Sequence, residues 1–161
     1  REAIERLESL REKYPSVPIL YNYLTIAYSH NYESEKAKEM SYKNYKNNPR
    51  YIFAKVNYAE ICLQEGNIDQ IPEIFEYKFD LKLLYPDRDI FHHSEATAFY
   101  GVLGLYWIKT GMLDQAKIAY DVLIAVDPDH KITKRLSRSL LWAAIKSKIF
   151  RWPALTNQQN S

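Results

Sequence analysis

Several residue types are scarce in this chain of 161 residues, and each scarcity narrows the class of protein. There is a single cysteine, Cys62, so no disulfide framework can form within the chain. Only four glycines stand against 14 tyrosines, which suits an array of helices better than a loop-rich β protein. The lack of a disulfide framework fits a reducing compartment, and no secretory signal pattern is visible, so we expect a cytoplasmic location.

Long apolar runs are also lacking. The uncharged stretch from Ala98 to Ile108 has eleven residues, and Lys109 ends it. A membrane-spanning helix needs about 20 apolar residues, so we expect no transmembrane segment. The stretch is then either a buried strand or a helix covered on several sides, and Gly101 and Gly104 favour the helix because glycine weakens strands.

Acidic residues are absent from the C-terminal part of the sequence. Residues 131–161 hold seven basic residues and no acidic ones, whereas residues 1–130 hold 15 basic and 20 acidic residues. The formal net charge of +2 is therefore an average over two unlike parts of the chain.

A set of aromatic and small residues recurs at fixed spacing along residues 1–130. Counted from Thr97, eight positions of a 34-residue unit hold Tyr100, Leu103, Gly104, Trp107, Gly111, Ala116, Tyr120 and Pro128. Counted from Pro18, six of these positions hold Tyr21, Leu24, Thr25, Tyr28, Ala37 and Pro49. Counted from Ile52, the matching residues are Tyr58, Ala59, Cys62, Gly66 and Phe75, and an earlier unit ends with Ala3, Leu7, Leu10 and Pro15.

This order and spacing resemble the tetratricopeptide repeat, a pair of antiparallel helices. The resemblance implies an all-α, right-handed solenoid of helical hairpins, a tetratricopeptide-type superhelix, closed by a C-terminal capping helix. Its predicted parts are a partial repeat at 1–17, full repeats at 18–51, 52–96 and 97–130, a basic capping helix at 131–152, and a flexible tail at 153–161. Small residues such as Gly104 and Ala116 are expected where the two helices of a unit cross. Gly111 is expected to end the first helix of its unit, and Pro49 and Pro128 are expected in the turns to the next unit.

The unit at 52–96 departs from this pattern. Ile71 takes the place of the small residue, and Pro72 follows it, so we expect Asp69 to cap a helix that begins there. The closing proline, Pro86, comes three residues late, which predicts a second helix one turn longer than usual. The next unit begins 11 residues later than the repeat requires.

The insertion in this unit ends in residues 85–94, YPDRDIFHHS, whose two aspartates and two histidines raise the question of a metal site. His92 and His93 are adjacent, so they cannot share the i, i+4 face of a metal-binding helix, and we expect no metal there. Ser94 followed by Glu95 indicates a helix N-cap instead.

No catalytic constellation is visible. Cys62 occupies a core position of its repeat, where a small buried side chain is expected rather than a nucleophile. The four histidines lack the neighbours of a triad, and there is no glycine-rich phosphate loop or metal-ligand spacing. We therefore expect a non-enzymatic protein with no catalytic residue, metal or cofactor.

The resemblance implies a concave groove, lined by the first helix of each unit, in which a segment of a partner protein binds. Its candidate residues are Asn22, Tyr23, Ile26, Phe53, Val56, Asn57, Glu60, Val102, Leu105 and Ile108. Only Asn57 matches the clamp that holds acidic chaperone tails in this family, so that role is not expected. The groove becomes more apolar towards 97–130, and two alternatives stay open: a partner segment covers it, or the chain's own C-terminal region does.

Residues 131–152 contain no proline, glycine or acidic residue and predict one long basic helix. One apolar stripe is expected to cap the last repeat and consists of Ile132, Leu136, Leu140, Ala143 and Phe150. A second stripe, on the opposite side, is a candidate interface and consists of Leu141, Trp142, Ile145, Ile149 and Trp152. The basic residues Lys134, Arg135 and Arg138 also lie away from the first stripe.

The sequence thus predicts a protein-interaction scaffold that binds a partner peptide or helix in an apolar groove. One alternative is self-association into a homo-oligomer through the C-terminal helix. The other is binding of an anionic surface, lipid or nucleic acid, by the same helix. Nucleic acid is less expected, because aromatic and basic residues interleave only in this helix and the rest of the chain is acidic.

Overall fold

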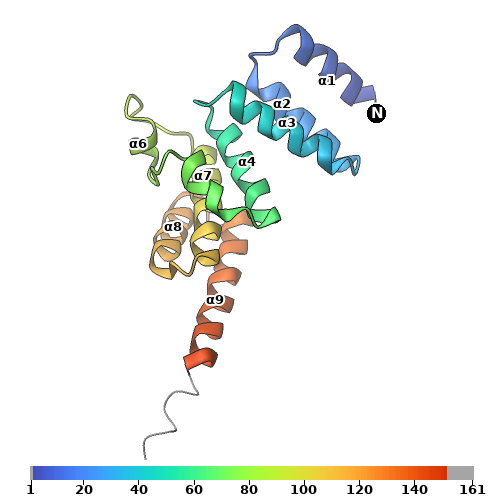
Figure 1. Cartoon of the computed structure of the whole chain (residues 1–161). Helices are drawn as coiled ribbons and strands as arrows, with labels where there is room; N and C mark the ends of the chain where they lie inside the picture. Colours follow the sequence, from blue (N-terminus) through green and yellow to red (C-terminus); the bar gives the residue numbers. More distant parts are fainter. Residues whose placement is uncertain (1, 152–161) are drawn as a thin grey trace, which may run out of the picture. The chain divides into compact units, whose positions relative to one another are not determined.

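The computed structural model describes residues 2–151, with side chains for residues 2–146. The described part is 77% helix and contains no strand, so the predicted all-α class is confirmed. The chain divides into two compact units, residues 1–91 and 92–161, which are described separately. Most helices of the two units are labelled in Figure 1.

The first unit is built from four regular helices followed by three short ones. The regular helices are α1 (Glu2–Lys13), α2 (Pro18–His30), α3 (Ser34–Asn47) and α4 (Ile52–Glu65). The short ones are η1 (Ile68–Gln70), α5 (Ile71–Ile74) and α6 (Leu81–Leu84). The helices α2 and α3 form a hairpin, with α1 packed on α2 and α4 packed on α3.

The ends of these helices follow from local sequence. Pro18 stands at the first position of α2, where its missing N–H costs nothing. Pro49 lies in the turn between α3 and α4, as predicted. Gly66 ends α4 with a φ of 84°, a left-handed conformation that glycine adopts without strain.

One hydrophobic cluster of the first unit forms where the apolar faces of α1, α2 and α3 meet. Its buried residues are Tyr21, Leu24, Tyr28, Ala37 and Met40, with Ile4 and Leu7 packed against them. These residues recur three or four positions apart on each helix, so each helix buries one face. Tyrosines connect α3 to α4: the rings of Tyr45 and Tyr58 are stacked with their centroids 5.0 Å apart.

The segment after α4 differs from its prediction. Asp69 does not cap a helix; it lies inside the 3₁₀ turn η1, which leads into the four-residue helix α5. Chain direction then changes at Glu76 and Tyr77, whose φ angles are 55° and 56°. The second helix of this predicted unit is therefore interrupted rather than one turn longer, and the expectation drawn from Pro86 was wrong.

A buried lysine on α4 explains where α5 stops. The Nζ atom of Lys55 donates a hydrogen bond of 2.8 Å to the carbonyl oxygen of Ile74, at the C-terminal end of α5. The backbone N–H of Tyr77 bonds to the carbonyl of Pro72 at 2.7 Å. Carbonyl groups that a longer helix would have bonded internally are thus satisfied by these two donors, and the helix can end.

The second unit consists of α7 (His93–Lys109), α8 (Leu113–Val126) and α9 (Lys131–Arg151). The helices α7 and α8 form a hairpin whose turn contains Gly111, with a φ of 78°, and α9 packs on both helices. The stretch from Ala98 to Ile108 lies within α7, so the helix was the correct choice over the strand. No helix of the described residues is both long and apolar enough to cross a membrane.

The N-cap of α7 lies two residues before the predicted one. His92, not Ser94, is the cap: its Nδ1 atom accepts the backbone N–H of Ser94 at 3.3 Å. The carboxylate of Glu95 accepts the backbone N–H of His92 at 2.9 Å, which completes a capping box. The imidazole nitrogen takes the part that a serine or aspartate oxygen plays in most caps, and the sequence pattern therefore pointed to the wrong residue.

Two glycines allow α9 to approach α7 closely. A Cβ atom on Gly101 would lie 2.5 Å from Cγ1 of Ile132, and one on Gly104 would lie 2.5 Å from Cδ2 of Leu136. The repeat pattern assigned Gly104 to the crossing within its own hairpin, but its small size serves the contact with α9. The C-terminal helix thus covers part of α7.

Candidate partner-binding groove

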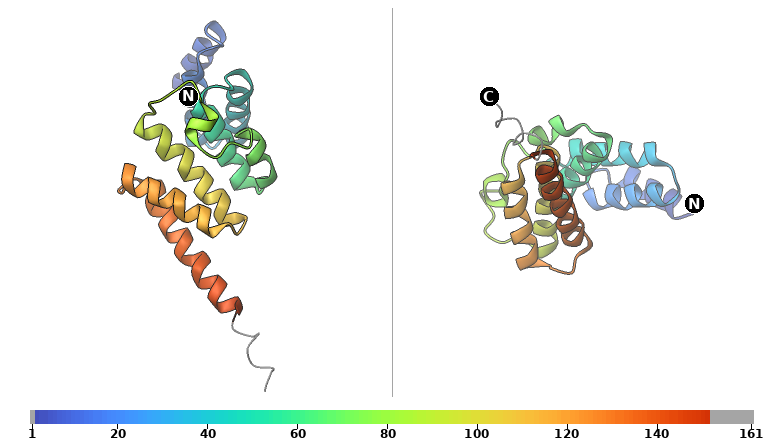
Figure 2. Two further views of the ribbon diagram at one scale, coloured as in Figure 1. Left: turned by 90° about the vertical axis from the view of Figure 1, so that its left-hand side faces the viewer. Right: turned by 90° about the horizontal axis from the view of Figure 1, so that it is seen from below.

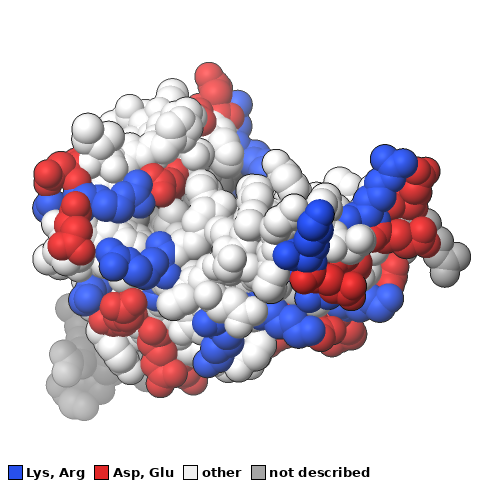
Figure 3. Space-filling model, turned by 90° about the horizontal axis from the view of Figure 1, so that it is seen from above, with Lys and Arg blue, Asp and Glu red and all other residues white. Residues whose placement is uncertain are grey.

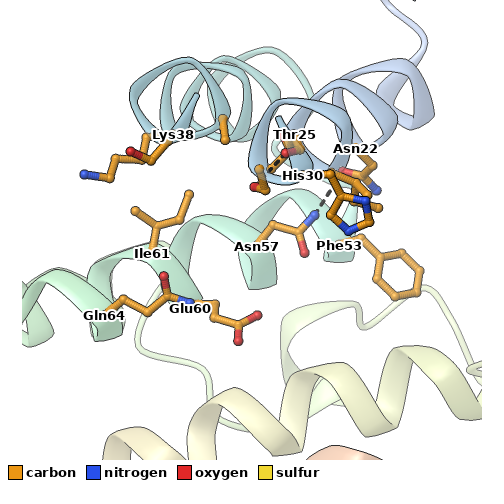
Figure 4. A pocket seen from close by; sticks show the side chains of 13 residues that line it. Asn22, Thr25, His30, Lys38, Phe53, Asn57, Glu60, Ile61 and Gln64 are labelled. Carbon is orange, nitrogen blue, oxygen red and sulfur yellow. Dashed lines mark hydrogen bonds between the residues drawn. The ribbon is translucent and has the colours of Figure 1, made fainter. Parts of the chain in front are cut away.

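A cavity of about 480 Å³ lies between α2, α3 and α4 in the first unit. Figure 4 shows its side chains, with α2 and α3 on one side and α4 facing them. The lining residues are Asn22, Thr25, Ile26, Ser29, His30, Ser34, Ala37, Lys38, Phe53, Asn57, Glu60, Ile61 and Gln64. We refer to this cavity as the groove.

Helical periodicity places these residues in the groove. On α2, Asn22, Ile26 and His30 are four residues apart, which puts them on one face of the helix. On α4, Phe53, Asn57 and Gln64 share a face in the same way. The two faces belong to successive predicted units, so the groove is a product of how the units pack.

A chain of amide groups fixes the wall of the groove. Asn44 of α3 is buried, and its Nδ2 atom donates to Oδ1 of Asn22 at 2.8 Å and to the carbonyl of Pro18 at 3.2 Å. Nδ2 of Asn57 donates to the same Asn22 oxygen at 3.1 Å. One asparagine oxygen thus joins all three helices, and the amides of Asn22 and Asn57 are held in fixed orientations.

The hydroxyl groups in the groove are also oriented. Oγ1 of Thr25 donates to the carbonyl of Tyr21 at 2.8 Å, and Oγ of Ser29 donates to the carbonyl of Thr25 at 2.8 Å. Because each proton is used within α2, the two oxygens offer lone pairs to any molecule in the groove. They can accept hydrogen bonds from a ligand.

The positive charge at one end of the groove is shared with acidic neighbours. Nζ of Lys38 is 2.5 Å from a carboxylate oxygen of Glu65 and 2.9 Å from one of Glu35. Hydrogen bonds to Glu65 and Glu35 raise the pKa of Lys38. A strongly acidic ligand would therefore find this lysine already engaged.

Apolar side chains complete the lining. Ile26 is 53% exposed, although it is a large aliphatic residue, and Phe53 and Ile61 are half-buried. Such side chains next to fixed amides and hydroxyls are the usual composition of a site that binds a ligand with both apolar and polar groups.

Only some of the predicted groove residues line the cavity in the structure. Those that line the cavity are Asn22, Ile26, Phe53, Asn57 and Glu60. Tyr23 is exposed and outside the cavity lining, and Val56 is buried. Residues of α3, such as Ser34 and Lys38, were not predicted, because the repeat pattern assigns the concave face to first helices alone.

The predicted apolar patch on α7 is not open to solvent. Val102 is 4% exposed and Leu105 is 8% exposed, and Ile108 is half-buried. Val102 and Leu105 therefore belong to the protein interior, and Ile108 lies at its edge. An exposed large apolar side chain on the predicted groove faces occurs instead at Ile26.

The Cys62 thiol and the possible metal ligands were the other candidates raised by the sequence. Burial raises the pKa of the Cys62 thiol, which disfavours the reactive thiolate. Within residues 2–146, no three His, Cys, Asp or Glu side chains are grouped so that they could hold a metal ion. The face of the molecule in Figure 3 carries interspersed acidic and basic side chains rather than a field of one sign.

The predicted interface on α9 is partly described. Leu141, Trp142 and Ile145 are exposed, with Leu141 63% and Trp142 64% accessible. The side chain of Ile149 and all of Trp152 lie outside the described residues, as does the predicted tail at 153–161. On the opposite side of α9, Leu136 is fully buried.

Known proteins add no assignment to these sites. The chain matches no protein-family model, no curated protein and no solved structure. What the groove does must therefore be inferred from the residues that form it.

Proposed function

We propose that the protein is a non-enzymatic scaffold of tetratricopeptide type that binds a segment of a partner protein in the groove. The observation that carries this proposal is the convergence of predicted positions. Asn22 and Ile26 from one predicted unit and Phe53, Asn57 and Glu60 from the next line a single cavity. The repeat spacing and the α2–α3 and α7–α8 hairpins support the superhelix.

The groove has the groups needed to hold a peptide. Apolar side chains of the peptide would pack on Ile26, Phe53 and Ile61. The oriented amide of Asn57 and the hydroxyl oxygens of Thr25 and Ser29 would accept peptide N–H groups. A cavity of about 480 Å³ can hold a few side chains and the backbone between them.

The exposed Ile26 provides the test. The 161-residue chain is used as bait to select binding peptides from a displayed random library. The Kd of each selected peptide is then measured by calorimetry for the parent chain and for the Ile26→Glu variant. We expect Ile26→Glu to raise Kd by at least about tenfold, because a carboxylate replaces an apolar contact. Circular dichroism should show unchanged helix content, since Ile26 is exposed.

A matched control separates groove binding from general surface effects. Ile118 of α8 is 63% exposed and lies outside the groove, so Ile118→Glu should leave Kd unchanged. A substitution at Leu105 would be a poor choice, because this residue is 8% exposed and a buried carboxylate would damage the fold. Peptides that bind Ile26→Glu and Asn57→Ala as tightly as the parent chain would contradict the proposal.

A further inference from the structure

A single line of exposed side chains along α9 changes from basic to apolar. Lys134, Arg138, Leu141 and Ile145 are spaced by four, three and four residues, so they follow one another on the same face of the helix. Trp142 lies beside Leu141 on this face, and both are more than 60% exposed. We refer to these five residues as the α9 stripe.

The fold of the second unit keeps the α9 stripe outward. The opposite face of α9 packs on α7 through Ile132 and Leu136, which fit against Gly101 and Gly104. Figures 1 and 2 show that the C-terminal half of α9 extends beyond the α7–α8 hairpin. The apolar end of the stripe is therefore accessible to a flat surface without any rearrangement of α9.

The basic end of the stripe borders a second cavity. This cavity, of about 520 Å³, lies between α8 and α9, and Lys134, Ser137 and Arg138 line it together with Tyr120 and Ile124. Nε of Arg138 donates to the carbonyl of Lys134 at 3.3 Å, which lays the guanidinium along the helix. The ion pair of Lys134 with Asp129, at 3.0 Å, is exposed and therefore weak, so an anionic ligand can displace it.

Charge decides between the possible occupants of this surface. Residues 131–161 contain no acidic residue, so pairing the stripes of two chains would bring like charges together. A nucleic acid would pair with Lys134 and Arg138 but would leave Leu141, Trp142 and Ile145 in water. A bilayer with anionic lipids offers phosphates for the cations and an apolar boundary for the other three side chains.

We propose that α9 binds the surface of an anionic phospholipid bilayer and lies in its plane. Leu141, Trp142 and Ile145 enter the boundary between headgroups and acyl chains. Lys134 and Arg138 pair with lipid phosphates at the level of the headgroups. This proposal concerns the second unit alone and does not depend on the function of the groove.

Vesicle binding tests the proposal with the full 161-residue chain. Sedimentation is compared for vesicles of phosphatidylcholine alone and vesicles that also contain phosphatidylserine. We expect binding only to the phosphatidylserine vesicles, and weaker binding as sodium chloride is added. Tryptophan emission should shift to shorter wavelength on binding, because Trp142 leaves water.

Paired variants identify the responsible side chains. Lys134→Gln with Arg138→Gln should weaken binding about 30-fold. Each cation near an anionic surface contributes about 1 kcal/mol, and the double variant removes two cations. Leu141→Ser with Ile145→Ser should weaken it by at least about tenfold through lost apolar contact. The control for the charges is Lys109→Gln with Lys117→Gln, which removes two exposed charges from α7 and α8. The control for the apolar contact is Ile118→Ser, which removes an exposed apolar side chain from α8. Both control variants should bind the vesicles as the parent chain does.

Other results would overturn the proposal. Failure to sediment with phosphatidylserine vesicles at low salt would exclude it, as would an equal loss of binding in the control variants. A dimer by light scattering that Leu141→Ser with Ile145→Ser makes monomeric would assign the stripe to a second copy of the chain. Binding to polyglutamate without binding to vesicles would assign it to an acidic protein.

Discussion

At the scale of single residues, Lys55 shows how one buried side chain can determine local chain direction. Its ammonium group is removed from water, bonds the Ile74 carbonyl at 2.8 Å and lies 3.0 Å from a carboxylate oxygen of Glu76. Hydrogen bonds from Lys55 and Lys78 lower the pKa of Glu76. The two lysines share one acidic partner, but only Lys55 is buried and caps α5.

This difference predicts unequal effects of two substitutions. Lys55→Met keeps the apolar stem but leaves the Ile74 carbonyl without its donor, which should lower the free energy of unfolding by about 1–3 kcal/mol. Lys78→Met removes only a partly exposed pair and should change it by less than about 0.5 kcal/mol. Urea unfolding followed by circular dichroism measures both values. Equal losses in the two variants would contradict the capping role of Lys55.

At the scale of helices, a charged hydrogen bond holds α1 to α2. The hydroxyl of Tyr28 donates to Oε1 of Glu8 at 2.7 Å, and Nε of Arg11 donates to Oε2 at 2.8 Å. Burial acts to raise the pKa of Glu8, but these two hydrogen bonds and the positive charges of Arg11 and Lys43 together outweigh it. The pKa therefore lies below its ordinary value of about 4.5. Burial and the bond to Glu8 raise the pKa of Tyr28 to about 12.

The lowered pKa of Glu8 gives a pH dependence with a definite sign. The carboxylate stabilises the folded state above about pH 4.5, and this contribution is lost as the pH falls through the lower folded-state pKa. Glu8→Gln should therefore be less stable than the parent at neutral pH by about 1 kcal/mol and should lose less stability on acidification. Urea unfolding from pH 7 to pH 3 measures this.

The control for this experiment lies on the same helix. Glu5 is exposed on α1, so Glu5→Gln should follow the acid dependence of the parent chain. If Glu5→Gln and Glu8→Gln gave the same pH profile, the bond to Tyr28 would not be the source of the effect.

The contact of α7 with α9 depends on Gly104 and can be tested by compensation. Gly104→Val should lower the free energy of unfolding by about 2 kcal/mol, because its side chain would overlap Leu136. Leu136→Ala opens space at this point, so the double variant should be more stable than the sum of the single losses predicts, by about 1 kcal/mol or more. Thermal and urea unfolding of the parent, the two single variants and the double variant give the four free energies of this double-mutant cycle. Additive losses would show that Gly104 does not face Leu136.

At the scale of the molecule, the two proposed binding surfaces belong to different compact units. The groove lies within residues 1–91, and the α9 stripe lies within residues 92–161. The two surfaces differ in chemistry. Amides, hydroxyls and apolar groups line the groove, whereas the α9 stripe combines cations with apolar groups, in keeping with the excess of basic residues in residues 131–161. Substitutions in one surface therefore serve as controls for experiments on the other.

Much of the helical layout could be predicted from periodicity and from glycine and proline. The turn at Gly111, the position of Pro49 between helices and the helix over Ala98–Ile108 were all predicted correctly. The interruption after Ile74 could not be predicted, because it depends on a lysine 19 residues earlier in the chain. The cap at His92 was missed because a histidine nitrogen replaces the usual oxygen acceptor.

For the groove, the residues expected from the sequence and the residues that line the cavity agree only in part. Five of the residues that the resemblance to the repeat placed in the groove line the cavity, because their spacing puts them on one face of each helix. Spacing does not say which faces are covered, and so Val102 and Leu105 were predicted as groove residues although they are buried.

By itself, the sequence determined the all-α class, the turns at Pro49 and Gly111, and the segregation of basic residues into the last helix. These are local properties, fixed by hydrophobic period, backbone preferences and composition. Only the tertiary structure decided which apolar faces are buried and how Asn22, Asn44 and Asn57 join three helices. Burial and hydrogen bonding between helices depend on distances between residues far apart in the chain, and a linear pattern does not contain those distances.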